Sequence, residues 1–423
     1  MSEPNPKRVL VLAATTGYQT RVFEEAARRI GFEPVMATDR CLHLPDPWGD
    51  GAVAVRFQEP EAGAEALAKL DPAPDGIVAV GDAPTRIAAL TAAKLGLRFH
   101  THEAVVRCRD KFIAHERFRE ARLPCPEYFR VPVHVDLAEA VRSVRFPCVL
   151  KPLGLSGSRG VIRANDEAEF AGAFERICAI LSQPEVRRVR ETEQDFIQIE
   201  EYIPGREFAL EGLVIDGVLQ TLAIFEKPDP LEGPFFEETV YLTPPRISDA
   251  VTAAIIETTR RAVTALGLTN GPVHAEMRVN ETGVYMLEAA ARPIGGLCAQ
   301  SLRFAGDATL EEILLRFAVG ENISGVRRET SASGVMMIPI PSSGIYSGVA
   351  GLEEARSVPG VTDVVVTAKE GQRMLRLPEG ASYLGFIFAR GNSPDEVEAA
   401  LRLSHSHLIF QIMAELPAMR PGT

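Results

Sequence analysis

Two buried strands near the N-terminus, each followed by a turn and a helical pattern, constrain the fold most strongly. RVLVLAA (8–14) is a continuous apolar run, and a helical pattern over 20–30 follows it after the turn TTG. DGIVAVGD (75–82) repeats the arrangement ahead of an alanine-rich helix over 84–95. Apolar strands joined through helices are typical of a parallel, doubly wound sheet. We therefore predict a Rossmann-like domain over 1–104. TTG is not the GxGxxG fingerprint, so NAD is not its expected ligand.

Length, charge and cysteine usage narrow the class of protein further. A chain of 423 residues predicts more than one hydrophobic core. The net charge of −12 argues against nucleic-acid binding, which favours a basic surface. No stretch approaches the roughly 18 apolar residues of a membrane span, and the N-terminal apolar run is too short for a signal peptide. The six cysteines form no CxxC motif. We expect a cytoplasmic protein with reduced thiols that binds neither nucleic acid nor membranes.

The remaining chain predicts two further domains, giving an α/β and α+β multidomain protein. From Glu329 onward, short strands and a final helix over 394–403 suggest a separate α+β unit. The proline- and acid-rich segment 228–240 predicts a long loop. We expect a central domain over 105–325, with a lid subdomain at about 125–203, and a C-terminal domain over 326–423. Elements expected in the central domain are a helix over 105–120, a helix over 137–144, strands over 147–151 and 196–203, and a helix over 248–266.

A lysine followed by a glycine-rich loop is the first candidate for chemistry. In VLKPLGLSGSRGV, Lys151 ends a buried strand. Glycines let backbone N–H groups approach a polyphosphate, and the lysine adds a positive charge. The alternative is a flexible hairpin loop without a ligand. The loop residues concerned are Gly154, Ser156, Gly157, Ser158 and Gly160.

Carboxylates at a strand junction form the second candidate. In IEEYIPGREF, Glu200 and Glu201 end one strand, and Glu207 begins the next strand after a Pro-Gly turn. Such carboxylates and the free backbone groups of the junction can hydrogen-bond an adenine edge and ribose hydroxyls. A solvated acidic turn is the alternative.

A hairpin with two glutamates is the third candidate. A plain two-residue turn in GPVHAEMRVNETGVYMLEAAARP would oppose Glu276 to Leu287. A bulge with Gly283 in the left-handed conformation would shift the register and place Glu276 opposite Glu288. Facing carboxylates repel unless a cation lies between them, and Mg²⁺ bound with nucleotide phosphates takes such oxygen ligands. Two outward-facing glutamates on an exposed strand are the alternative.

The order of these groups over 105–316 resembles the ATP-grasp superfamily, in which a glycine-rich lid closes over ATP. The combination of HAEMRV…LEAAARPIGG with the C-terminal segment EEARSVPGV…YLGFIFARG is most similar to L-amino acid ligases. The resemblance implies phosphate contacts at Lys111 and Lys151, and adenine contacts at Glu200 and the Ile203 backbone. It also implies a ribose contact at Glu207 and Mg²⁺ ligands, with Mn²⁺ as a substitute, at Glu276 and Glu288.

The same resemblance implies an ATP-dependent ligase that joins a small-molecule carboxylate to an amine through an acyl phosphate. Arg292 would meet the carboxylate substrate, and Lys151 would stabilise the added charge. His274 would orient or deprotonate the amine, unless it packs beside Glu276 for structure. A homodimer would be consistent with the resemblance, because dimers are common in this superfamily. Most members carry Asn two residues after the second metal glutamate, where this chain has Ala290, so a water or another side chain must replace that ligand.

Two alternatives stay open at this point. One is an ATP-grasp enzyme that activates bicarbonate or formate, and the other is a catalytically silent ATP-binding subunit. The sequence leaves the substrates undefined. Side chains that could line an apolar acyl pocket, or belong to the core instead, are Phe235, Phe236, Tyr241, Leu297 and Cys298.

Overall fold

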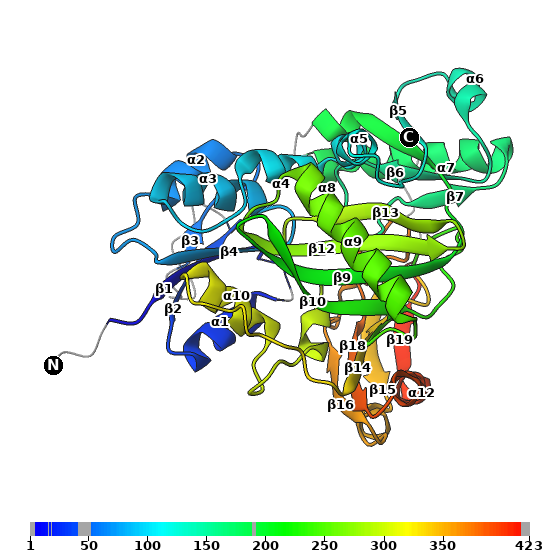
Figure 1. Cartoon of the computed structure of the whole chain (residues 1–423). Coiled ribbons are helices and arrows are strands. Elements are labelled where there is room, and N and C mark those ends of the chain that lie inside the picture. The colour runs from blue at the N-terminus through cyan, green and yellow to red at the C-terminus, as the bar shows by residue number, and fades with distance from the viewer. Residues whose placement is uncertain (1–4, 16, 18, 41–51, 188–191, 416–423) are drawn as a thin grey trace, which may run out of the picture.

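A parallel four-stranded sheet forms the N-terminal domain, as the two strand–turn–helix units predicted. The computed structural model describes residues 5–15, 17, 19–40, 52–187 and 192–415. The strand order is β3-β2-β1-β4, and helices lie on both faces (Figure 1). The elements are β1 (Arg8–Ala13), α1 (Thr20–Arg29), β2 (Glu33–Thr38), β3 (Val53–Ala54), α2 (Pro60–Leu67), β4 (Gly76–Val80) and α3 (Thr85–Leu95).

One helix of the N-terminal domain comes from far along the chain. Helix α10 (Leu310–Ala318) packs against α1 and β4, next to the blue strands in Figure 1. Its buried face shares a core with Val9 and Val11 of β1. A Cβ on Gly76 would lie 2.7 Å from the backbone carbon of Ala318, so glycine permits this close approach. The N-terminal sheet is therefore packed directly onto the domain that follows it.

The predicted helix over 105–120 is two helices. Helix α4 (His102–Arg109) ends where Asp110 adopts an extended backbone, and α5 (Lys111–Glu120) begins at the next residue. The Asp110 side chain accepts hydrogen bonds from the N–H groups of Phe112 and Ile113, at 2.8 and 3.1 Å. Aspartate is a strong N-cap, and this local signal overrode the continuous helical pattern. The break places Lys111 in the first turn of α5.

The lid subdomain has an antiparallel sheet in the order β5-β8-β6-β7, covered by a long helix. Its strand β8 ends at Glu201, two residues earlier than expected, because the chain enters the turn at Pro204–Gly205. The helix expected over 137–144 is one α-helical turn followed by a 3₁₀ turn. The elements are β5 (Tyr128–Pro132), α6 (Leu137–Ala140), the 3₁₀ turn Val141–Ser143, β6 (Cys148–Pro152), β7 (Ile162–Ala164), α7 (Glu167–Leu181), α8 (Pro184–Arg187), the 3₁₀ turn Thr192–Asp195 and β8 (Phe196–Glu201).

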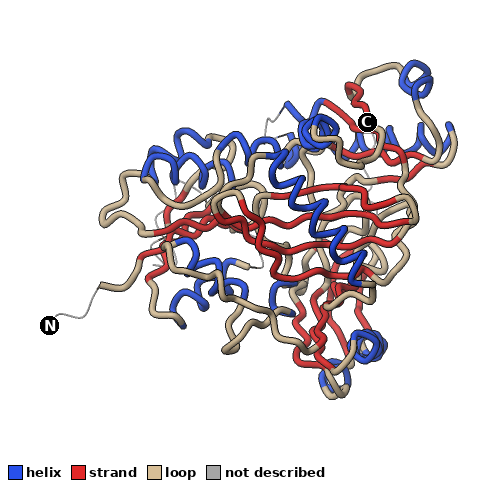
Figure 2. The backbone as a smooth tube through the Cα atoms, viewed as in Figure 1, coloured by secondary structure: helices blue, strands red, loops and turns tan. Residues whose placement is uncertain are grey.

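An eight-stranded sheet forms the centre of the molecule, in the order β13-β12-β9-β10-β11-β14-β18-β16. Helix α9 (Asp249–Leu266) lies across one of its faces (Figure 2), where Ile255, Val263 and Leu266 meet the apolar side chains of the strands. The first five strands in chain order are β9 (Arg206–Ile215), β10 (Val218–Lys227), β11 (Val240–Thr243), β12 (Gly271–Asn280) and β13 (Gly283–Ala290).

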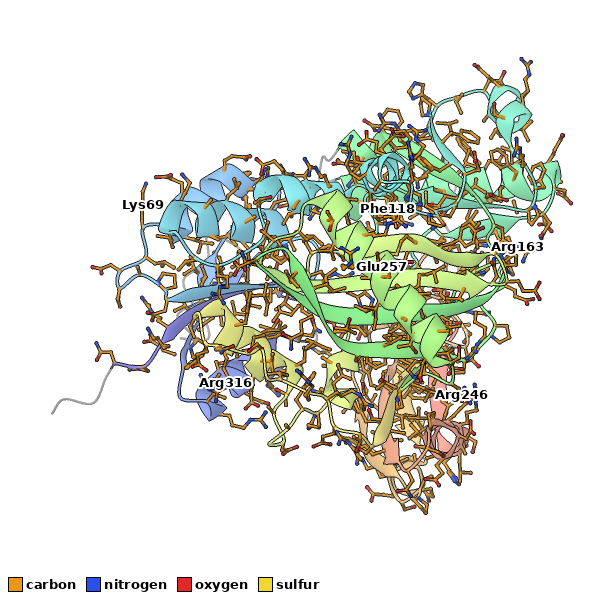
Figure 3. The ribbon with its side chains drawn as sticks, viewed as in Figure 1. Lys69, Phe118, Arg163, Arg246, Glu257 and Arg316 are labelled. Carbon is orange, nitrogen blue, oxygen red and sulfur yellow. The ribbon has the colours of Figure 1, made fainter. Side chains whose placement is uncertain are left out.

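The C-terminal unit is not separate in its sheet, contrary to the expectation. Strand β14 pairs with β11, so β14, β18 and β16 continue the central sheet. Arg246, labelled in Figure 3, ties the parts together: it binds Glu226 of β10 and both Asp395 and Glu398. The elements are β14 (Ala332–Ile338), β15 (Gly344–Ala350), α11 (Leu352–Arg356), β16 (Val361–Val366), β17 (Arg373–Met374), β18 (Gly385–Gly391), α12 (Pro394–His407) and β19 (Ile409–Met413).

Helix α12 is four residues longer than predicted, and a last strand, β19, pairs with β15 in a small three-stranded sheet. Leu408 ends the helix in an extended conformation, and the alternating pattern of β19 begins there. None of the described helices is long and apolar enough to cross a membrane. Five cysteines are free thiols in the described part of the chain, and Cys41 lies outside it.

Candidate active site

A cavity of about 380 Å³ lies where the N-terminal domain, the lid and the central sheet meet. Most of the predicted site residues line it, although they are spread over almost 200 positions of sequence. Gly154 and Gly160 are not among the lining residues. Those that line it are Lys111, Lys151, Ser156, Gly157, Ser158, Glu200, Glu201, Ile203, Glu207, His274, Glu276, Glu288 and Arg292.

The glycine-rich loop between β6 and β7 presents three backbone N–H groups at the cavity wall. Gly157 and Ser158 have positive φ angles of 65° and 55°. Within the described residues, the N–H groups of Ser156, Gly157 and Ser158 donate to no carbonyl or side chain. Gly160 differs, because its N–H donates to Pro378 O at 2.9 Å, and a Cβ there would lie 2.8 Å from Pro152 Cγ. The free N–H groups are therefore confined to the middle of the loop.

Two lysines approach this loop from different elements. Lys111 Nζ donates to Leu155 O at 2.9 Å and lies 3.8 Å from Glu288 Oε2. Lys151 Nζ, at the end of β6, lies 2.6 Å from Glu200 Oε2. Both lysines line the cavity, as do the loop residues that carry the free N–H groups. Each ammonium group already has a carboxylate partner, and together with the free N–H groups of the loop the two lysines are the donors at this wall that an anion would meet.

Glu200 is almost fully buried beneath the cavity and is held by neighbours. Its carboxylate accepts from Lys151 and from Gln198 Nε2, the latter at 2.7 Å. Burial opposes ionisation, yet the Lys151 ammonium holds the pKa of Glu200 below its ordinary value. Nearby, Ile203 O accepts from Arg278 Nη1 at 2.9 Å, whereas the Ile203 N–H donates to no carbonyl within the described residues. The Ile203 N–H is thus an available hydrogen-bond donor of a residue that lines the cavity.

The two hairpin glutamates lie directly opposite each other, as predicted, but the bulge is elsewhere. Strands β12 and β13 pair Glu276 with Glu288 and Met277 with Met286, so Leu287 is the extra residue. The turn itself is tight, because the Asn280 side chain accepts from both the N–H and the hydroxyl of Thr282. The prediction of a bulge at Gly283 is therefore wrong in position, but a one-residue shift does pair Glu276 with Glu288 as expected. The observed bulge lies beside the carboxylates that it aligns.

A buried lysine and a further glutamate complete a carboxylate cluster that the sequence prediction missed. Lys227 Nζ, at the end of β10, lies 2.8 Å from Glu207 Oε1 and 3.3 Å from Glu276 Oε1, and it also contacts Glu238. The Tyr241 hydroxyl donates to Glu238 at 2.8 Å. IFEK places a lysine at the end of a buried strand, as VLK does at Lys151, and that shared signal could have identified Lys227.

Glu207 already has two cationic partners. Besides Lys227, it accepts from Arg278 Nε at 3.0 Å. Both carboxylate oxygens are thus engaged, although the residue lines the cavity. A contact from Glu207 to a ribose would have to share these oxygens with the two cations.

His274 lies between two carboxylates. Its Nδ1 is 3.1 Å from Glu211 Oε2 and its Nε2 is 3.2 Å from Glu276 Oε1. Burial lowers the pKa of His274, but the two carboxylate partners outweigh it and raise the pKa to about 9. The imidazole is therefore protonated at neutral pH and fixes Glu276. This arrangement favours an orienting role over proton abstraction.

Arg292 is held by a residue of the N-terminal domain. Its Nε donates to Asp82 Oδ1 at 2.9 Å, and burial of the guanidinium is outweighed by that carboxylate, which raises the pKa of Arg292. Asp82 follows β4 in the Gly-Asp turn and also lines the cavity. Its role was not predicted, since only the fold brings it to Arg292, 210 positions away.

Aromatic and apolar side chains from later segments of the chain also line the cavity. Phe236, Tyr241 and Cys298 line it, together with Met337 and Tyr383 from the C-terminal unit. Phe235 and Leu297, which were grouped with them from the sequence, do not line it. Phe235 instead forms a bridge with Ile162 of the lid. The expected loop 228–240 thus contributes to both the cavity and the lid contact.

Comparison with known proteins identifies two domains in this chain. Residues 144–301 match the family described as ATP-grasp domain, and residues 336–412 match the family described as L-amino acid ligase C-terminal domain 2. The crystal structure of L-amino acid ligase from Bacillus licheniformis superposes with a TM-score of 0.82 at 26% identity, covering 97% of this chain and 100% of that one.

Two further proteins are similar to this chain, one in sequence over half of its length and one in fold. Alanine–anticapsin ligase of Bacillus subtilis is 27% identical over 52% of this chain, a match that spans only 49% of that protein. Carboxyaminoimidazole ribonucleotide synthase from Aspergillus clavatus, solved with ATP, shares the fold at 19% identity, with a TM-score of 0.69 over 95% of this chain and 99% of that one. The chain therefore contains an ATP-grasp domain, followed by the C-terminal domain of L-amino acid ligases, and it is similar in sequence and fold to an L-amino acid ligase of known structure.

Proposed function

We propose that this chain is an ATP-dependent ligase that joins the carboxylate of one amino acid to the amine of a second substrate. The observation that carries the proposal is the convergence on one cavity of two lysines, a loop with free N–H groups and the facing pair Glu276 and Glu288. The relationship to L-amino acid ligases supports amino-acid substrates.

The phosphate-binding part of the proposed site is the cavity wall formed by the glycine-rich loop and the two lysines. Lys111, Lys151 and the N–H groups of 156–158 would hold the phosphates of ATP, because they offer positive charge and unused donors. The Ile203 amide would meet the adenine edge, with Glu200 and Glu201 beside it and Glu207 near the ribose. Burial of these groups beneath the lid would exclude water from a reactive intermediate.

The donor chemistry of Glu276 and Glu288 fits Mg²⁺, since two carboxylates face each other at the cavity wall. When bound there, Mg²⁺ would neutralise charge on the phosphates. The chain's own residues would hold the organic substrate. Arg292, fixed by Asp82, offers a guanidinium to a carboxylate, and protonated His274 keeps Glu276 in place.

The proposed reaction balances in two steps. A substrate carboxylate oxygen attacks the γ-phosphorus of ATP, which forms an acyl phosphate and releases ADP. The amine nitrogen of the second substrate then attacks the acyl carbon, loses a proton and expels inorganic phosphate as the amide forms. Lys151 and Arg292 would stabilise the negative charge that develops in these steps. The apolar side chains of the lining, among them Phe236 and Met337, suit an organic side chain better than bicarbonate or formate.

The proposal is tested by phosphate release from ATP with Mg²⁺ against an array of amino acids, paired with mass measurement of the products. We expect phosphate release only when amino acids are present, together with a dipeptide or another amide. Phosphate release stimulated by bicarbonate or formate alone would instead support an ATP-grasp enzyme that activates one of these small carboxylates. ATP binding without release under any of these conditions would identify a silent nucleotide-binding protein.

A matched pair of variants localises the activity to the site. Glu288→Gln removes a charged ligand at nearly constant shape and is expected to lower turnover at least about 100-fold. Glu281→Gln changes an exposed glutamate in the turn of the same hairpin and is expected to leave turnover unchanged. Equal activity of Glu288→Gln and the wild type would contradict the assigned metal pair.

A further inference from the structure

A short segment of the C-terminal unit, residues 378–381, lies against the glycine-rich loop of the lid. The Gly160 N–H donates to Pro378 O at 2.9 Å. A Cβ placed on Gly157 would lie 3.4 Å from Ala381 Cβ, so the loop backbone lies close to Ala381. The segment belongs to the part of the chain that matches the C-terminal domain of L-amino acid ligases, whereas the loop belongs to the ATP-grasp domain. The two domains therefore meet directly at the lid.

An ion pair joins the same segment to the long helix of the lid. Arg176 of α7 binds both carboxylate oxygens of Glu379, at 2.5 and 2.9 Å, and its guanidinium holds the pKa of Glu379 below the ordinary value. The Arg176 guanidinium also lies over the ring of Phe235, 4.9 Å from the ring centroid. A half-exposed ion pair contributes little alone, so a closed lid depends on the sum of these contacts.

A second loop holds the neighbouring strand of the lid. The Arg163 N–H of β7 donates to Pro234 O at 2.9 Å, and Arg163 Nη1 donates to Glu232 O at 2.7 Å. Phe235 of the same loop forms the bridge with Ile162. This loop joins β10 to β11 of the central sheet. The lid is therefore bound by two loops, one from the central sheet and one from the C-terminal unit.

The segment 378–381 is anchored in the central sheet. It is followed by Leu384, whose side chain is fully buried and whose N–H donates to Ile338 O at 3.0 Å, where β18 pairs with β14. The Gly380 N–H donates to Arg376 O at 2.9 Å, which closes the turn on itself. The segment is thus fixed to a sheet that does not belong to the lid.

We propose that the segment 378–381 is a latch that holds the lid closed over the cavity. The C-terminal unit then has a part in the reaction although it supplies none of the proposed phosphate or metal contacts. ATP enters only when the lid opens, so the latch has to open and close in each cycle. A closed latch would also keep water from the acyl phosphate, and this consequence alone rests on the proposed function.

The first test locks the latch with a disulfide. Gly157→Cys and Ala381→Cys together place two thiols on Cβ atoms 3.4 Å apart, close to the roughly 3.5–4.5 Å between the Cβ atoms of a disulfide. Ser158 has a φ of 55°, so this loop accommodates a side chain in the left-handed region. We expect the disulfide to form on oxidation, and mass spectrometry of the peptides to locate it. The oxidised protein should lose uptake of ATP with Mg²⁺, and a reductant should restore it.

The two single variants are the matched controls for the disulfide. Whatever the rate at which Gly157→Cys or Ala381→Cys takes up ATP, oxidation should not change that rate. A folded double variant that forms no bond between the two positions would overturn the proposal, because the loop and the latch would then not be adjacent in solution. A cross-linked protein that takes up ATP as fast as its reduced form would also overturn it.

A charge reversal loosens the latch at a residue that does not line the cavity. Glu379→Lys gives Arg176 a partner of like charge, so amide hydrogen exchange in the lid of the nucleotide-free protein should speed up at least about 3-fold. Glu370→Lys makes the same change at an exposed position before β17 and should leave exchange in the lid unchanged. Equal exchange in the two variants would overturn the proposal, whether or not the double cysteine variant folds.

These outcomes are separate from a failure of the ligase proposal, because the cross-link and the exchange are measured without turnover. During turnover, water that enters past a loosened latch would attack the acyl phosphate, return the carboxylate and release phosphate. Glu379→Lys should therefore form less amide per phosphate than the wild type, and an unchanged ratio would overturn the protective role. If no amino acid stimulates phosphate release while the disulfide and the exchange are as expected, the proposed function fails and the latch stands.

Discussion

Protonated His274 makes the stability of the fold depend on pH in a defined window. The folded-state pKa of about 9 lies above the ordinary value of 6.5, because hydrogen bonds and charge from Glu211 and Glu276 outweigh burial. A group with a raised folded pKa stabilises fully below its unfolded pKa, and that contribution is lost as pH rises through the folded pKa. We therefore expect the His274 contribution to be largest below about pH 6.5 and absent near pH 10.

The magnitude follows from the size of the shift. A difference of about 2.5 units corresponds to roughly 3 kcal/mol at low pH, of which about 2.5 kcal/mol remains at pH 7. His274→Gln keeps hydrogen-bonding capacity but cannot titrate. The difference in free energy of unfolding between wild type and His274→Gln, measured by urea unfolding from pH 7 to pH 10, should shrink by about 2.5 kcal/mol.

Using the difference between the two proteins cancels titration of tyrosines, cysteines and lysines common to both. Parallel stability profiles for the wild type and His274→Gln across this range would refute the reasoning. They would mean that the imidazole is neutral at pH 7, and a role in accepting a proton from the amine would then be favoured.

Three further predictions concern the surroundings of the site. Asp82→Ala removes the partner of Arg292, a charged hydrogen bond worth about 1.5–3 kcal/mol, so the KM for the amino-acid substrate should rise roughly 10-fold or more while the KM for ATP is unchanged in steady-state assays. Ala290→Asn adds a carbonyl donor and should tighten Mn²⁺ binding about 10-fold by electron paramagnetic resonance, whereas unchanged affinity would show that its oxygen does not reach the ion. Arg176→Ala breaks a half-exposed bidentate pair with Glu379, at 2.5 and 2.9 Å, between the lid and the C-terminal unit. This ion pair is worth about 0.5–1 kcal/mol, so its loss should speed up amide hydrogen exchange in the lid roughly 2- to 5-fold. Unchanged exchange would show that the pair does not hold the lid.

Local patterns were sufficient to predict the parallel N-terminal sheet and the facing glutamates. The continuous apolar strands, each followed by a helix, predicted the parallel sheet. The alternation of side chains along the hairpin strands showed that Glu276 and Glu288 could face each other only if the register shifted by one residue. The position of the bulge could not be predicted in the same way. Asn280 and Thr282 close a tight turn by side-chain bonds, which moves the extra residue to Leu287.

The missed elements depend on contacts between distant parts of the chain. Asp82 reaches Arg292 only because the N-terminal sheet packs beside the central domain, and Lys227 meets Glu238 only because the loop between β10 and β11 folds back. The fusion of the C-terminal strands with the central sheet depends on the pairing of β11 with β14, for which the sequence carries no local signal. Secondary-structure propensity predicts the conformation of a segment but not which strand it will pair with.

The central claim is that this cavity couples ATP cleavage to the joining of an amino-acid carboxylate and an amine. The most direct measurement is phosphate release from ATP with Mg²⁺ across an amino-acid array, with the mass of each product determined. We predict release that requires amino acids, one amide formed for each phosphate, and loss of both in Glu288→Gln. Binding of ATP without amino-acid-dependent phosphate release or amide product would contradict the claim.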